Sequence, residues 1–258
     1  MILEKAMNPT PIPHRKLSKA PIVEAVIDIR TMPVVNQNQE TLRAYILSKL
    51  PGYSNIQSMF AFQSTVQMKP DGKVNSTAKD GRWVGYKCSQ PEGKYIIQWR
   101  ENGFAMSRLA PYDSWDVFLA DTLAVFAVYM EFTKITQVNQ LGVRFINRIE
   151  YDRSTESIDT ILTGGNHDIL GAEAERANLF HQDSFALRSK HFVNIIKAME
   201  PNAMPNQKGA VILDVDVIRQ SVISPEATKL KAELTEMRVI KNNIFFQSIS
   251  KVKLEQLA

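Results

Sequence analysis

The chain has 258 residues, of which 44% are hydrophobic and 22% are charged, and its formal net charge at pH 7 is +4. This composition is typical of a globular protein and excludes an intrinsically disordered chain, which would contain fewer hydrophobic residues. No apolar run approaches the roughly 20 residues of a membrane-spanning helix, and the N-terminal residues lack the apolar region of a signal peptide, so we expect a cytoplasmic protein without membrane association. A single cysteine, Cys88, excludes an internal disulfide and is consistent with a reducing compartment.

The first half of the chain alternates between strand and helix signals. Apolar residues at every second position predict a strand over 21–30, and helical spacing predicts a short helix over 39–50. From 56 to 109, four glycine-containing turns separate strand-like runs, which is typical of an antiparallel meander. Ser114 is the expected N-cap of an amphipathic helix that begins at Trp115, and the apolar stripe of this helix is wide enough to cover a sheet.

The second half repeats this order of signals. Residues 139–152 alternate between apolar and polar and predict a central strand. A short helix is predicted over 157–162, and two strands are predicted over 185–196 and 210–219. Ser224 and the proline after it have the pattern of an N-cap and a first helical residue, so we expect the last helix to start there.

The two halves indicate an internal duplication, because each has a strand, a short helix, antiparallel strands and a long helix. We therefore expect an extended arm over 1–20, a first α+β half over 21–136 and a closely associated second half over 137–258. The predicted fold class is α+β, with helices packed on one side of antiparallel sheet. A saddle like that of TATA-binding protein is the fold-level analogy, and it implies nothing about function.

Charged side chains share one face of the predicted strands. Arg144 and Arg148 point away from the apolar side of the central strand, and other strands carry further charged residues with this orientation: Glu24, Asp28, Arg30, Asp214 and Asp216. If these strands are neighbours, opposite charges pair across the sheet, and the face is either a solvated surface or a surface that binds a partner. Asp214 and Asp216 also have the spacing of two carboxylate ligands of a divalent cation, although a lone pair does not form a metal site.

Motifs of catalysis are absent from the sequence. The chain has no G-x-S-x-G nucleophile elbow, no HExxH zinc motif and no phosphate-binding loop with its lysine. Cys88 lies in a strand-like run and is expected to be buried and unreactive. We therefore predict no catalytic residue, no metal and no cofactor.

Arg108, Tyr112 and Trp115 lie where the meander joins the first long helix. Residues of these types dominate the energetic centres of protein interfaces, so this segment is a candidate partner-binding site. In the alternative interpretation, Tyr112 and Trp115 fill the core, while Arg108 pairs with Asp113 or Asp116.

Basic and aromatic residues interleave in the runs RWVGYK and KYIIQWR. A strand surface on which nucleic-acid bases stack needs this pattern, and a half-exposed meander produces the same pattern. Together with the positive net charge, it makes nucleic acid the second class of partner to consider.

Five segments along most of the chain resemble a sporadically distributed bacterial family of uncharacterised proteins of about this length. In order, they are APIVEAVIDIR, GFAMSRLAPYDSWDVF, LGVRFINRIEY, VILDVDV and IFFQSIS. The family usually has a His at the position that Arg238 occupies in this chain. The resemblance implies no established activity, and the patchy distribution of the family implies genes carried with mobile elements, defence systems or toxin pairs.

The sequence therefore favours a non-enzymatic binding protein that recognises a protein partner, in a mobile-element or defence-associated locus. One alternative is a nucleic-acid-binding module that uses the open sheet face, and another is a metal-assisted hydrolase. A homodimer is a further expectation, because an open sheet leaves unpaired strand edges. The residues expected to bind a partner are Arg108, Tyr112, Trp115, Arg144 and Arg148.

Overall fold

A computed structural model describes most of the chain. The described residues are 16–34, 37–62, 64–68, 74–78, 81–163, 178–200 and 208–258. Most of the expected N-terminal arm lies outside them, and its last five residues form neither helix nor strand.

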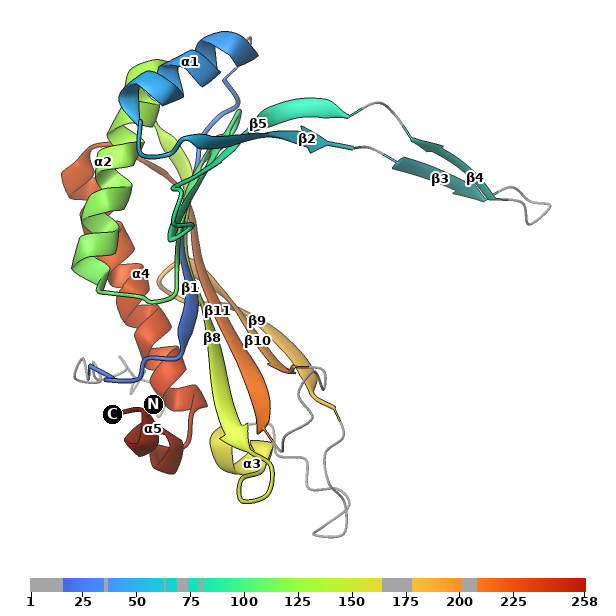
Figure 1. Cartoon of the computed structure of the whole chain (residues 1–258), viewed down its shortest axis with the longest axis vertical. Helices are drawn as coiled ribbons and strands as arrows, with labels where there is room; N and C mark the ends of the chain where they lie inside the picture. The colour runs from blue at the N-terminus through green and yellow to red at the C-terminus, as the bar shows by residue number, and fades with distance from the viewer. Residues whose placement is uncertain are drawn as a thin grey trace, which may run out of the picture.

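Nine strands form one open antiparallel sheet (Figure 1), which confirms the α+β class. The strands are β1 (Ile22–Arg30), β2 (Asn55–Ala61), β5 (Arg82–Ser89), β6 (Tyr95–Arg100), β7 (Gly103–Leu109), β8 (Val138–Asp152), β9 (Phe180–Ala186), β10 (His191–Met199) and β11 (Lys208–Ile223). Their order across the sheet is β2-β5-β6-β7-β1-β8-β11-β10-β9. A separate pair, β3 (Ser64–Met68) and β4 (Val74–Ala78), projects beyond the ends of β2 and β5 in Figure 1.

β1 and β8 join the two halves at the centre of the sheet. They run antiparallel, with Ala25 opposite Phe145 and Ile27 opposite Val143. Next to β1 lies β7, the last strand of the first half, and β6, β5 and β2 follow outward. Next to β8 lies β11, the last strand of the second half, and β10 and β9 follow outward. The two halves therefore share one sheet and follow one topological plan.

Apart from the shortest one, which lies at the end of β8, the described helices lie on one side of the sheet (Figure 1). They are α1 (Gln39–Lys49), α2 (Trp115–Thr133), α3 (Ile158–Ile161), α4 (Ala227–Ser248) and α5 (Lys251–Leu257). Both ends of the sheet curve away from α2 and α4, so the sheet has a convex face under the helices and a concave face on the other side. No helix in the described ranges is both long and apolar enough to cross a membrane.

The core lies between the convex face and the long helices, and aromatic rings fill its first half. The ring of Tyr129 from α2 lies 5.0 Å from that of Trp99 and stacks on that of Phe126 at 5.6 Å, measured between centroids. All three side chains are fully buried. Full burial of a large apolar side chain contributes about 1.5–3 kcal/mol, so this cluster fixes α2 on the sheet.

Three local predictions were wrong. The single strand expected over 185–196 is the hairpin β9–β10, because the chain turns at residues 187–190 with Lys190 in the left-handed region, at a φ of 62°. β4 was not predicted. The last helix begins at Ala227 instead of at Ser224, whose hydroxyl accepts a hydrogen bond from the backbone N–H of Glu226.

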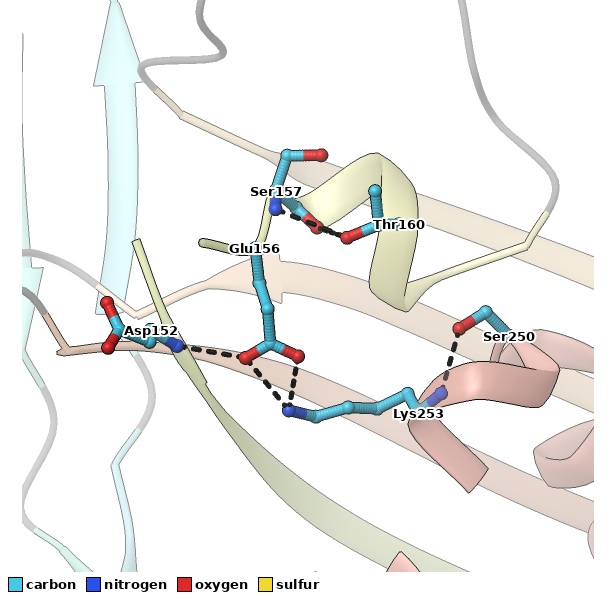
Figure 2. A network of polar contacts seen from close by, with 6 residues as sticks. All are labelled: Asp152, Glu156, Ser157, Thr160, Ser250 and Lys253. Atoms are coloured by element: carbon cyan, nitrogen blue, oxygen red, sulfur yellow. Dashed lines mark hydrogen bonds and ion pairs between the residues drawn. The ribbon is translucent and has the colours of Figure 1, made fainter. Parts of the chain in front are cut away.

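The end of the chain is attached to the turn that follows β8, as Figure 2 shows. The ammonium of Lys253 on α5 lies 2.9 and 3.2 Å from the two carboxylate oxygens of Glu156, and the backbone N–H of Asp152 donates to the same carboxylate at 3.0 Å. Ser250 caps α5 through a hydrogen bond from the N–H of Lys253 to its hydroxyl. Since both charged side chains are largely buried, this pair has a structural role, which is to hold α5 in place.

Candidate functional site

The concave face of β1, β8 and β11 carries the charged residues that the sequence predicted to share one side. These strands are neighbours, and their register places Arg144 between Val26 and Asp216. Burial along β8 confirms which side each residue faces: Phe145 and Ile149 are buried under the helices, whereas Arg144 and Glu150 are exposed on the other side. The expected pairing of opposite charges across the sheet is confirmed as well.

Arg144 and Asp214 form an ion pair on this face in which two guanidinium nitrogens bind the two carboxylate oxygens. The Arg144 Nε atom lies 2.9 Å from Oδ1 of Asp214, and its Nη2 atom lies 2.6 Å from Oδ2. The Asp214 side chain is only 8% exposed, whereas that of Arg144 is 45% exposed. The guanidinium therefore supplies most of the compensation for a carboxylate that water reaches poorly.

The other arginines of the concave face are also paired. The guanidinium of Arg148 makes three hydrogen bonds to Glu200, the shortest at 2.7 Å, and contacts Glu150 as well. Asp28 accepts a hydrogen bond from the Nε of Arg30 at 3.0 Å and another from Arg100 of β6. These pairs leave the face without a row of free cations among the residues that the structure describes.

Asp216 lies beside the Arg144–Asp214 pair and is the least compensated carboxylate of this group. Burial raises its pKa to about 6, Arg144 opposes this rise, and the negative charges of Asp214 and Asp28 add to it. On the neighbouring strand β10, Asn194 lies opposite Asp216 and accepts a hydrogen bond from the Ser184 hydroxyl at 2.7 Å.

Asp216→Asn is expected to change how stability depends on acidity. The pKa of Asp216 rises from 3.8 to about 6 on folding, so between these values the folded protein binds more protons than the unfolded protein. Wild-type stability therefore falls as the pH rises through this window, and the variant should lose this slope. Urea unfolding at a series of pH values measures it, with the exposed Glu150→Gln as the control that keeps the slope. An unchanged slope in Asp216→Asn would contradict a raised pKa of Asp216 in the folded protein.

A metal site at Asp214 and Asp216 is not supported. No group of three metal-ligating side chains occurs in the described ranges, and Asp214 is already held by Arg144. Two further carboxylates of the neighbouring strand are too far along β8 to join them, because Glu150 lies opposite Ala210 and Asp152 lies opposite Lys208. Metal-assisted hydrolysis therefore has no ligand set on this part of the sheet.

The structure divides the five predicted partner-binding residues between the two faces. Arg144 and Arg148 lie on the concave face, but Arg108, Tyr112 and Trp115 lie on the helix side. The Nη2 of Arg108 donates to Asp113 at 2.6 Å, and the rings of Tyr112 and Phe145 are in edge contact at 5.5 Å. Trp115 and Arg108 are buried, which agrees with the core interpretation of this segment rather than with an exposed interface.

Three of the four aromatic residues of RWVGYK and KYIIQWR lie on the helix side of the sheet, and the fourth, Trp83, is half-buried in edge contact with Tyr86, at 5.3 Å between ring centroids. Tyr86 and Trp99 are buried on the helix side of the sheet, and the hydroxyl of Tyr95 donates to Asp121 of α2 at 2.7 Å. Because the three rings lie under the helices, the alternation of basic and aromatic residues follows from packing of the meander.

The sequence prediction missed Lys241, a buried lysine on α4. Met237 and Phe245 of this helix are apolar, and position 241 lies four residues from each of them. The period of 3.6 residues places Lys241 on the same side, and the structure buries all three residues against the sheet. A charged residue within an otherwise apolar helical stripe was the signal available in the sequence.

Comparison of the chain with protein-family models finds no match, and comparison with curated proteins finds no significant match either. The family resemblance of the five sequence segments therefore stays a prediction.

Proposed function

We propose that the protein binds another protein through its concave face. The observation that carries this proposal is the charge of the face, which is close to balanced. On β1, β8 and β11 its basic residues are Arg30, Arg144, Arg148 and Lys208, and its acidic residues are Glu24, Asp28, Glu150, Asp152, Asp214 and Asp216. Nucleic-acid binding requires an excess of cations to neutralise phosphates, and on these three strands basic residues do not outnumber acidic ones.

Apolar side chains lie between these charged residues and support the proposal. Ile146, Ile212 and Ile218 are only partly buried, although they belong to the central strands. Phe192 of β10 lies opposite Ile218 and is 45% exposed. Curvature, paired charges and partly exposed apolar residues together resemble a protein-binding surface, in which apolar anchors are surrounded by polar groups.

The experiment is a capture of partners from the native host with a tagged full-length chain, with nuclease added to half of each sample. We expect a protein partner that survives nuclease and is lost with Phe192→Ser. The matched control is Phe185→Ser, because Phe185 is 47% exposed on adjacent strand β9 but pairs with Val193 and lies on the opposite face. Mass spectrometry identifies the retained proteins.

Two outcomes would contradict the proposal. If the captured proteins are lost after nuclease treatment, the ligand is nucleic acid. It would then bind a surface other than the charge-balanced concave face. Equal loss of partner in Phe185→Ser and Phe192→Ser would place the interaction at the β9–β10 end of the sheet, where β9 pairs with no further described strand on its outer side, instead of on the concave face.

A further inference from the structure

Helix α4 buries an ammonium group against the convex face of the sheet. Lys241 is 6% exposed, and its Nζ lies 3.8 Å from the centroid of the Phe145 ring of β8. Burial of an unpaired charge is strongly unfavourable, and contact with an aromatic face offsets only a small part of that cost. An apolar residue would fill this position without that cost, so packing alone does not account for a lysine.

A second cation stands one turn away on the same helix. Arg238 is half-buried, and its guanidinium lies 5.6 Å from the centroid of the Trp115 ring. Burial lowers the pKa of Lys241 to about 7, and the charge of Arg238 acts in the same direction. Within the described ranges, neither Lys241 nor Arg238 forms an ion pair with a carboxylate. Asp113 pairs with Arg108 instead, and Asp116 is exposed.

A further hydrogen-bond donor near this position is unused. The indole Nε1 of Trp115, whose ring lies 6.3 Å from that of Phe145, is buried and has no acceptor among the residues that the structure describes. Trp115 is also the first residue of the 19-residue helix α2, whose N-terminus carries the positive end of the helix dipole. All of these groups donate hydrogen bonds or carry positive charge, and none of them accepts.

We propose that Lys241 and Arg238 bind the oxyanion group of a small molecule, a carboxylate or a phosphate, between α4 and the start of α2. Such a group accepts hydrogen bonds from the ammonium and the guanidinium and removes the repulsion between them. The half-buried ring of Tyr112, in edge contact with that of Phe145, provides apolar surface for the rest of the ligand. Arg238 is half-buried, so the proposed site is open to solvent beside this residue. This site is independent of the concave face, since it lies on the other side of the sheet.

Sulfate is the first probe, because its charge does not change while Lys241 titrates. Calorimetry and thermal unfolding at constant ionic strength compare sulfate with chloride for the full-length wild type, Lys241→Met, Arg238→Gln and Lys231→Met. Lys231 is exposed on α4, so Lys231→Met is the same substitution outside the site. Loss of one charged hydrogen bond is expected to weaken sulfate binding about tenfold or more in the first two variants only. Benzoate and phenyl phosphate then distinguish a carboxylate ligand from a phosphate ligand.

Wild-type affinity for sulfate is also expected to fall as the pH rises through the titration of Lys241, while that of Lys241→Met stays level. Sulfate stabilises proteins in general, so an equal rise of the unfolding midpoint in all four proteins, with no binding heat, would overturn the proposal. Retention of wild-type affinity by Arg238→Gln would overturn it too, and this variant keeps the test decisive if Lys241→Met does not fold.

Discussion

Lys241→Met is expected to stabilise the protein at neutral and acidic pH. The pKa of Lys241 is about 7 in the folded protein and about 10.4 in an unfolded chain, so between these values the unfolded state binds more protons. Wild-type stability should therefore rise with pH across this window, by up to about 1.4 kcal/mol per pH unit. The gain from Lys241→Met should be largest below pH 7 and should disappear as the pH approaches the unfolded-state value.

Urea unfolding of the full chain, in the absence of multivalent anions, measures this difference at each pH. Lys231→Met is the control, because it makes the same substitution at an exposed position of the same helix. A Lys241→Met profile parallel to that of the wild type would show that Lys241 keeps an ordinary proton affinity in the core. Taking the difference between two proteins also removes contributions shared by both, such as that of Arg238.

Arg144→Leu is expected to destabilise the protein by about 2–3 kcal/mol, because it leaves the buried Asp214 carboxylate without its partner. It should also raise the pKa of Asp216 further, since Arg144 lowers that value in the wild type. Asp214→Leu should cost less than Arg144→Leu, because the more exposed guanidinium can recover water. The double variant should regain part of the loss.

Urea unfolding of the wild type, both single variants and the double variant gives the coupling free energy of this pair. Arg148→Leu is the comparison within the same strand, and it should cost less than about 1 kcal/mol because its partners Glu150 and Glu200 are more exposed than Asp214. Equal losses for Arg144→Leu and Arg148→Leu would show that the burial of Asp214 does not determine the cost of removing its partner.

Local sequence patterns predicted many of the elements correctly. The alternation over 139–152 predicted β8, and Ser114 caps α2 as expected, with its hydroxyl accepting from the N–H of Val117 at 3.3 Å. Asn147 lies on the apolar side of β8, where its side chain donates a hydrogen bond to the carbonyl oxygen of Leu213 at 3.0 Å. Turn positions were less reliable, since the hairpin at 187–190 has no glycine or proline to announce it.

The candidate sites depended on information that no local pattern contains. Arg108 and Arg144 are both arginines in alternating strands, yet one is buried under α2 and the other lies on the concave face. Alternation determines which residues share a face, but it does not determine which face the helices cover. That choice is made by packing between segments far apart in the chain.

The sequence by itself determined the class of the fold, the order of its elements and the set of charged residues that share one face. These properties follow from periodicity and turn chemistry, which act over a few residues. The tertiary structure decided that β1 and β8 join both halves into one sheet, that Asp214 is compensated by Arg144, and that Lys241 meets Phe145 beside Arg238. Strand pairing and helix docking set these contacts over long sequence separations, and burial then determines what each charge costs.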